Sequence, residues 1–160
     1  MQARREVAGG AKSRQPRSLS ARAIGHLARR DYGRVELRAK LLATGAEADE
    51  VDAVLDALVA QGYLSDVRFA QAVVRQKTGQ YSRRAIAESL KAKGVPGEAT
   101  TAALDAAPPD DDATMVALWQ RRFGKAPADD REKARQVRFL QSRGFGLSAI
   151  FKLLRNPPVE

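Results

Sequence analysis

The chain has 160 residues, of which 44% are hydrophobic and 29% are charged, a balance typical of a folded protein rather than of a disordered one. It contains no cysteine and a single histidine, which excludes disulfides, thiolate metal sites, cysteine nucleophiles and multi-histidine metal clusters. Lysine and arginine number 28 against 19 aspartates and glutamates, and the net charge of +9 favours polyanionic partners such as nucleic acid.

The first 17 residues hold five basic side chains and one acidic one, together with Gly9-Gly10 and Pro16. This composition predicts a disordered basic tail, which either touches a phosphate backbone or is a solvated leader without a task. The segment lacks the apolar stretch of a secretory signal, and no run of about 18 apolar residues occurs in the chain. We therefore expect a cytoplasmic protein without a membrane partner.

From Ser18 onward the sequence is typical of helices. Apolar residues recur at spacings of three and four, as in Val51, Val54, Leu55 and Leu58, whereas β-branched runs and strand-like alternation are missing. The fold class is therefore predicted to be all-α. Four glycines follow such runs, where a left-handed helix C-terminus is expected: Gly45, Gly62, Gly94 and Gly144.

Six residues of one segment recur with a constant offset of 49. Tyr32, Gly33, Arg34, Leu37, Leu41 and Gly45 are matched by Tyr81, Ser82, Arg83, Ile86, Leu90 and Gly94. A weaker third copy places Leu140 and Gly144 another 50 residues on. Such a period in a helical chain predicts an elongated tandem array of three three-helix repeats, at 18–65, 66–108 and 109–160. Neighbouring repeats should stack and bury what each unit leaves exposed.

Charge follows the same period. Residues 18–46 hold six basic and two acidic side chains, whereas residues 47–66 hold six acidic and no basic ones. Residues 67–97 hold seven basic and one acidic, residues 98–112 hold five acidic and no basic, and residues 113–160 hold ten basic and four acidic. In the first two repeats the first two helices are therefore basic and the third is acidic. We expect two oppositely charged faces on the array, with salt bridges between neighbouring helices as the alternative.

No enzyme motif is found in the sequence. It has no glycine-rich phosphate-binding loop, no dinucleotide fingerprint and no H-E-x-x-H pair, and His26 on a predicted helix is expected to be structural rather than part of a catalytic triad. The acidic groups Asp49-Glu50, Asp129-Asp130 and 110–112 stand where helices begin, so capping explains them better than acid–base catalysis or magnesium binding. We expect a non-enzyme with no cofactor and no metal site.

Two sets of aromatic residues have two interpretations each. Trp119 and Phe123 are four residues apart on one helical face and are expected in the core of the third repeat, with base stacking as the alternative. Tyr32 and Tyr81 occupy equivalent positions and are expected to pack between helices, although their hydroxyls can also reach outward.

The function is expected in the basic helices. Arginine outnumbers lysine, which suits bidentate contacts with phosphate or carboxylate groups, although for any single arginine a solubilising role is the ordinary alternative. The thirteen predicted contacts are Arg29, Arg30, Arg34, Arg38, Arg68, Arg75, Arg83, Arg84, Lys91, Lys93, Arg121, Arg122 and Arg138.

Three stretches carry a family resemblance. They are L-A-R-R-D-Y-G-R-V-E-L-R-A-K-L-L-A-T-G (27–45), V-L-D-A-L-V-A-Q-G-Y-L-S-D-V-R-F-A (54–70) and R-Q-K-T-G-Q-Y-S-R-R-A-I-A-E-S-L-K-A-K-G-V (75–95). In these the chain resembles the RecX family, and the most specific piece is G-Y-L-x-D-x-R-F-A, here Gly62 to Ala70. The third repeat fits the family more loosely.

This resemblance implies a bacterial cytoplasmic regulator that modulates, chiefly by inhibition, the RecA recombinase in homologous recombination, DNA repair and the SOS response. RecX proteins consist of tandem three-helix repeats that bind within the groove of the RecA–single-stranded-DNA filament. The implied partners are the RecA filament and the phosphate backbone of single-stranded DNA, and we expect a monomer. The thirteen basic residues are then candidate RecA or DNA contacts, by electrostatic inference.

Two other functions are considered. A helix, a short turn with Gly33 and a basic second helix also fit a helix-turn-helix transcriptional regulator that binds duplex DNA, although the pattern recurs three times and no dimerisation segment is evident. A pure protein scaffold, without DNA affinity at any salt concentration, is the third hypothesis.

Overall fold

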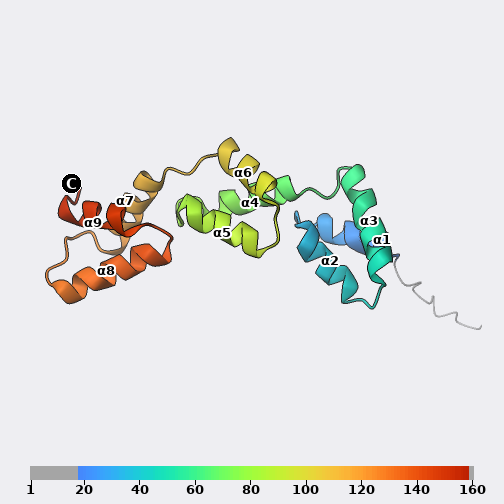
Figure 1. The fold of residues 1–160 in the computed structure, drawn as a ribbon, viewed down its shortest axis with the longest axis horizontal. Coiled ribbons are helices and arrows are strands. Elements are labelled where there is room, and N and C mark those ends of the chain that lie inside the picture. Colours follow the sequence, from blue (N-terminus) through green and yellow to red (C-terminus); the bar gives the residue numbers. More distant parts are fainter. Residues whose placement is uncertain (1–17, 159–160) are drawn as a thin grey trace, which may run out of the picture.

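The computed structural model describes residues 18–158, so the predicted tail at residues 1–17 lies outside the described part of the chain, as do residues 159 and 160. Within 18–158 the chain forms nine helices and no strand (Figure 1). They are α1 (Leu19–Leu27), α2 (Arg34–Leu42), α3 (Ala48–Ala60), α4 (Asp66–Lys77), α5 (Arg83–Ala92), α6 (Gly97–Ala106), α7 (Asp111–Arg122), α8 (Asp130–Ser142) and α9 (Leu147–Arg155).

The helix ends follow from local chemistry. The side chains of Ser18, Ser65 and Ser82 each accept a hydrogen bond from the backbone N–H three residues on, and Asp110 and Asp129 do the same, so these two aspartates are helix caps as predicted. The four glycines predicted to be left-handed have φ between 75° and 94°, which confirms that prediction.

The helices group into three bundles, which we call repeat 1 (α1–α3), repeat 2 (α4–α6) and repeat 3 (α7–α9). Each repeat encloses its own apolar cluster. One core position near the end of the second helix, held by Leu41, Leu90 and Leu140, is fully buried in all three repeats. The 49- and 50-residue offsets in the sequence therefore mark structurally equivalent core positions.

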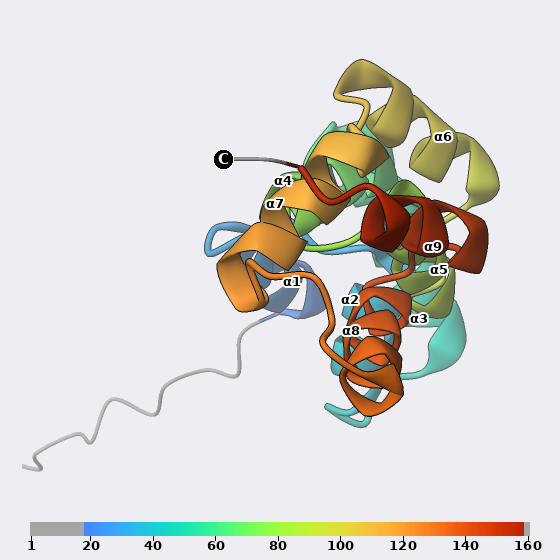
Figure 2. The same ribbon diagram turned by 90° about the vertical axis from the view of Figure 1, so that its left-hand side faces the viewer.

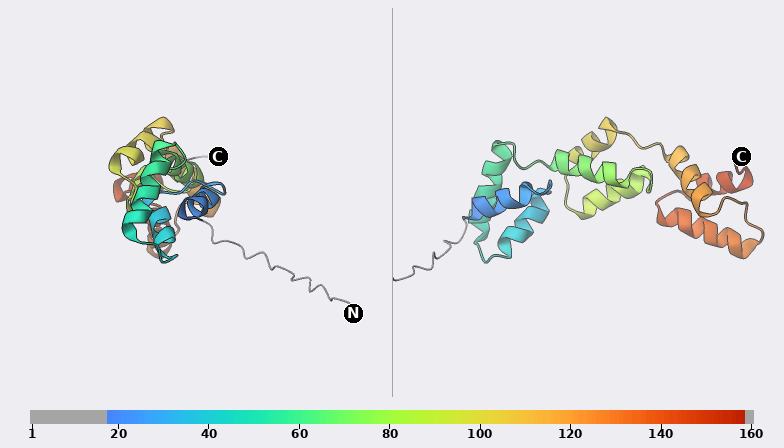
Figure 3. Two further views of the ribbon diagram at one scale, coloured as in Figure 1. Left: turned by 90° about the vertical axis from the view of Figure 1, so that its right-hand side faces the viewer. Right: turned by 180° about the vertical axis from the view of Figure 1, so that it is seen from behind.

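The repeats follow one another along an extended body (Figure 1), and the view from behind shows the same extended arrangement (Figure 3). Along the long axis the three repeats project onto one another (Figure 2). The elongated tandem array is thus confirmed. Shared burial between neighbouring repeats is confined to the junctions, where Phe69 lies against Gly33 and the buried Ser82 lies against Gly144. The extensive helix–helix contacts fall within repeats, and the three apolar cores are separate.

The core of repeat 3 contains a polar substitution. Gln136 stands at the position of Leu37 and Ile86 and is fully buried. The indole N–H of Trp119 donates a hydrogen bond to Gln136 Oε1 at 2.9 Å. The side-chain amide of Gln136 in turn donates to the Lys125 carbonyl at 3.1 Å. The buried polar group is therefore satisfied, and the lost apolar residue explains why the third copy is faint in the sequence.

Candidate nucleic-acid interface

Adjacent repeats are joined by the same polar contact at both junctions. At the junction of repeats 1 and 2, Asp66 Oδ1 accepts the backbone N–H of Arg34 at 2.9 Å. At the junction of repeats 2 and 3, Asp111 Oδ1 accepts the backbone N–H of Arg83, also at 2.9 Å. The first residue of one repeat thus caps the second helix of the repeat before it, and this fixes where the basic second helices start.

A glycine turn completes each junction. A Cβ at Gly94 would lie 2.6 Å from the side chain of Val35, and one at Gly144 would lie 2.3 Å from Ser82 Oγ. Ser82 also donates its backbone N–H to the Arg143 carbonyl at 2.9 Å and its hydroxyl to the Gly144 carbonyl at 2.8 Å. The end of α8 is therefore held against the start of α5 by backbone contacts.

Six of the thirteen predicted contacts form ion pairs. The pairs are Arg30 with Glu36, Arg34 with Asp56 at 2.7 Å, Arg38 with Asp52 at 2.8 Å, Arg68 with Asp31 at 3.4 Å, Arg83 with Asp105 at 2.7 Å and Arg84 with Glu88 at 3.2 Å. Three of them join the second and third helices of a repeat. Salt bridges between neighbouring helices were the predicted alternative to two oppositely charged faces. The arginines of α2 and α5 thus lie beside the acidic helices rather than apart from them.

One of these pairs perturbs the pKa values of its members. The hydrogen bond from Arg38 lowers the pKa of the Asp52 carboxyl, and the same bond raises the pKa of the Arg38 guanidinium. Their side chains are 41% and 42% exposed, so solvent and salt screen the interaction. A phosphate group can compete with a carboxylate for an arginine in such an exposed pair.

The other seven predicted contacts are exposed and have no carboxylate partner among residues 18–158. They occur in every repeat, with one in repeat 1 and three each in repeats 2 and 3. They are Arg29, Arg75, Lys91, Lys93, Arg121, Arg122 and Arg138.

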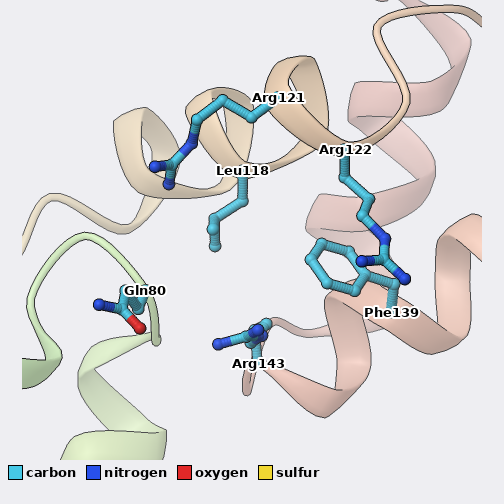
Figure 4. Close-up of a pocket in the computed structure, with 6 residues that line it drawn as sticks. All are labelled: Gln80, Leu118, Arg121, Arg122, Phe139 and Arg143. Carbon is cyan, nitrogen blue, oxygen red and sulfur yellow. The ribbon is translucent and has the colours of Figure 1, made fainter.

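The structure brings two of these seven together with a residue outside the predicted set. Arg121 and Arg122 of α7 and Arg143 at the end of α8 line a cavity of about 340 Å³ at the junction of repeats 2 and 3 (Figure 4). Gln80, Leu118 and Phe139 complete the lining. Arg143 is not among the thirteen predicted contacts. It lies about twenty residues after α7 in the sequence, and only the structure shows that the two are close in space.

The remaining predicted contacts do not join this cavity. Arg138 lines a cleft on α8 with Arg131 and Arg135, and Arg29 lines another in repeat 1 with Arg22 and His26. The thirteen residues are therefore spread over the length of the array rather than gathered in one site.

The aromatic side chains are mostly structural. Trp119 is 2% exposed, and Phe123 packs edge-on against Phe139 with ring centroids 5.5 Å apart, so both belong to the core of repeat 3 as predicted. Tyr32 is buried and meets His26 edge-on at 5.6 Å, which gives this histidine a packing role.

Two features that other functions would need are missing from residues 18–158. No cluster of three or more histidine, aspartate or glutamate side chains suited to a metal ion occurs there. None of the described helices has the length and apolar character needed to cross a bilayer.

The fold and this distribution of charge define an all-α tandem-repeat protein with exposed basic residues on each repeat. Family models match all three repeats: "RecX, first three-helix domain" at residues 21–58, the second such domain at 65–104 and the third at 110–154. The match to the third domain extends the resemblance beyond the segments that carried it in the sequence.

Individual proteins agree with the family models. The Regulatory protein RecX of Ralstonia pickettii is 42% identical over 142 residues, which cover 88% of this chain and 89% of that protein. The one from Leptothrix cholodnii is 41% identical over 145 residues, covering 91% and 92%. The crystal structure of RecX from Lactobacillus salivarius matches with a TM-score of 0.70 at 19% identity, covering 86% of this chain and 92% of that one. The chain belongs to the RecX family of regulatory proteins.

Proposed function

We propose that this protein binds the RecA–single-stranded-DNA filament and modulates RecA, mainly by inhibiting its recombinase and ATPase activities. Membership of the RecX family supports a regulatory role. The extended array suits a partner that is itself long, because successive repeats can contact successive units of a polymer. On this proposal the protein acts in the cytoplasm as a monomer.

The observation that carries the proposal is the set of exposed cations without carboxylate partners on all three repeats. Seven of the thirteen proposed contacts are of this kind and are the first candidates for direct contact with DNA phosphates or acidic patches of RecA. The six ion-paired arginines are secondary candidates, since an exposed pair contributes only about 0–1 kcal/mol and can exchange its carboxylate for a phosphate.

The mechanism follows from occupancy. An array lying along the filament groove covers the surface that RecA needs for adding subunits and for pairing with a second DNA. Filament growth, strand exchange and productive ATP turnover are then hindered together. No chemical step by this chain is required.

A titration of RecA's DNA-dependent ATPase tests the proposal. We expect substoichiometric amounts of the protein to suppress the rate, because one array blocks several RecA subunits. The double variant Arg83→Glu with Arg84→Glu is expected to inhibit less while keeping its helicity by circular dichroism. An unchanged ATPase rate in the presence of excess wild-type protein rejects the proposal.

The same preparation separates the two other hypotheses. Sequence-selective, salt-sensitive binding to duplex DNA without RecA would favour the helix-turn-helix transcriptional regulator. RecA binding that is insensitive to charge changes on the basic helices, with no DNA affinity at low salt, would favour the protein scaffold.

A further inference from the structure

We propose that the junction of repeats 2 and 3 is a phosphate-binding site, in which Arg121, Arg122 and Arg143 hold the backbone of single-stranded nucleic acid. This inference deepens the proposed function and rests on it for the choice of polymer. We call the three side chains the junction arginines.

The junction arginines come from two elements that meet at one cavity. Figure 4 shows Arg122 reaching down from α7 to Phe139 and Arg121 running along α7, while Arg143 lies across the cavity at the end of α8. Gln80, from the loop before α5, forms the wall on the side of repeat 2. The site therefore exists only where the two repeats meet.

Two of the guanidinium groups are held in place by aromatic rings. The Arg143 guanidinium carbon is 4.9 Å from the ring centroid of Tyr81 and 5.4 Å from the ring centroid of Phe139. The Arg122 guanidinium carbon is 5.1 Å from the ring centroid of Phe139. Stacking uses the face of a guanidinium and leaves the N–H groups at its edge able to bind an oxyanion in bidentate fashion. The carbonyl of Arg143 also accepts the Ser82 N–H, so its backbone is fixed.

No carboxylate among residues 18–158 forms an ion pair with the junction arginines. Two acidic residues of repeat 3 make hydrogen bonds elsewhere, because Asp111 caps the backbone N–H of Arg83 and Asp129 caps the N-terminus of α8. Three like charges around one cavity repel one another unless an anion joins them. This uncompensated charge points to an anionic ligand.

The equivalent positions one repeat earlier do not carry such a cluster. The two capping aspartates set α7 in register with α4, and the glycine turns set the end of α8 in register with the end of α5. Gln80, Arg121, Arg122 and Arg143 correspond to Asp31, Gln76, Lys77 and Lys93. The earlier set sums to +1, from two lysines and one aspartate, whereas the junction set sums to +3. The chain has thus concentrated charge at the second junction.

The loop residue makes this contrast sharpest. Asp31 pairs with Arg68 at 3.4 Å, whereas Gln80, its counterpart 49 residues later, is neutral. A carboxylate at Gln80 would occupy the wall of the junction cavity and compete with any anionic ligand.

The choice of single-stranded nucleic acid over an acidic protein segment rests on the proposed function and on the arginines themselves. Leu118 is 7% exposed and Phe139 is half-buried beneath the guanidinium groups of Arg122 and Arg143, so the accessible surface of the site is mainly guanidinium. An unpaired base can stack on the plane of an arginine guanidinium while its phosphate meets the N–H groups of another. An acidic peptide has no base to stack, and duplex DNA keeps its bases within the helix.

Binding of a labelled oligothymidylate without RecA, measured by fluorescence anisotropy over a salt series, tests the site. The variant Arg121→Gln, Arg122→Gln, Arg143→Gln is compared with Arg131→Gln, Lys152→Gln, Arg155→Gln, which removes the same charge from the same repeat away from the junction. We expect the junction variant to lose at least about tenfold in affinity, and its slope of log K against log salt to become shallower by about 2. The control should lose less than about threefold.

A second pair of variants avoids disturbing the stacked arginines. Gln80→Asp should weaken oligothymidylate binding several-fold, whereas the neutral Gln80→Asn should bind like the wild type. Circular dichroism melts verify that all variants fold. Equal losses in the two triple variants, together with no difference between the two Gln80 variants, would overturn the site.

Competitors identify the ligand. If ATP or polyglutamate binds the wild type and loses affinity in the junction variant while oligothymidylate affinity stays unchanged, the ligand is a free nucleotide or an acidic protein and the inference is wrong. The RecA ATPase titration keeps the two proposals apart. A wild-type protein that binds oligothymidylate through the junction arginines but leaves the ATPase rate unchanged rejects only the proposed function.

Discussion

The junction of repeats 1 and 2 and the junction of repeats 2 and 3 share a backbone design and differ in charge. In both, an aspartate at the first residue of a repeat caps the second helix of the repeat before it, and a left-handed glycine packs against the same helix start. At the first junction Asp31 neutralises Arg68, whereas at the second the loop residue is Gln80 beside the three junction arginines. Contacts that position repeats are thus separate from side chains available to a ligand.

The difference continues within the repeats. The third helices α3 and α6 are acidic and supply Asp52, Asp56 and Asp105 to arginines of the second helices. The third helix of repeat 3, α9, instead carries Lys152 and Arg155 in its last turn. Repeat 3 therefore forms no internal ion pair among its described residues and exposes its positive charge.

The largest expected effect is a difference in unfolding free energy between alanine variants of the two junction glycines, Gly144 and Gly94. Gly144→Ala forces a left-handed backbone on alanine and pushes its Cβ against the buried Ser82 and the Cβ of Ala85, so we expect a loss of about 3 kcal/mol in the unfolding free energy. Gly94→Ala would place its Cβ 2.6 Å from a methyl group and 2.9 Å from the Cβ of the exposed Val35. Rotation of the Val35 side chain moves the methyl group but not the Cβ, so this surface turn must shift as well, and about 2 kcal/mol is expected.

Urea unfolding of each glycine variant measures this difference. Circular dichroism follows the whole chain, and the single tryptophan, Trp119, reports on repeat 3. Gly45→Ala is the control, because nothing lies within 4 Å of its added Cβ. Equal losses for the Gly144 and Gly94 variants would show that the second junction is no tighter than the first.

A smaller effect is expected in the core of repeat 3. Gln136→Leu restores the residue type of repeats 1 and 2 but leaves the Trp119 indole N–H without its acceptor, so we expect a loss of about 1–3 kcal/mol by urea unfolding. The double variant Gln136→Leu, Trp119→Phe removes the donor that lost its acceptor, so its total loss, measured by circular dichroism, should be smaller than the sum of the two single losses. A double variant whose loss equals the sum of the two single losses would contradict this coupling.

The capping aspartates should contribute equally at the two junctions. Asp66→Ala and Asp111→Ala each leave one backbone N–H without its acceptor, and we expect about 1 kcal/mol of destabilisation in both. Asp→Asn at either position keeps an acceptor oxygen and should cost less. A strong effect at one junction only would show that the two contacts are not equivalent.

The smallest effect concerns the Arg38–Asp52 pair, which repeat 3 lacks. Because Arg38 lowers the pKa of Asp52, the pair stabilises the fold above the carboxyl's ordinary pKa of about 3.9, and this contribution is lost as the pH falls through the lowered value. The stability difference between wild type and Asp52→Asn should therefore shrink below about pH 4 and also in 1 M salt. A difference that is independent of pH would exclude this pair as its source.

The helical repeats were predictable because their cores repeat in sequence. Leu41, Leu90 and Leu140 recur at nearly constant spacing and are fully buried, so apolar periodicity alone located the second helix of each repeat. Periodicity identifies buried positions without saying which helix covers them, so it did not show how much of each repeat is covered by its neighbours. Gln136 interrupts the pattern in repeat 3, and its partner Trp119 is visible only in three dimensions.

The candidate site was less predictable than the fold. Counting charges along the chain located the basic helices but gave no facing partners, so the pairing of Arg34 with Asp56 came only with the structure. Arg143 was not selected because the turn after α8 must fold back onto α5 before it meets α7. The sequence shows that Gln80 replaces the Asp31 of the first repeat. Only the structure shows that this residue lines the junction cavity beside the arginines.

The separation of the three cores has a mechanical consequence. Bending at the first junction strains the Asp66 cap and the Arg68–Asp31 pair, and bending at the second strains the Asp111 cap and the two hydrogen bonds of Ser82, while all three apolar clusters stay closed. The molecule can therefore adjust its curvature like a chain of rigid links. Such an object can follow a helical track whose pitch varies, without unfolding any of its links.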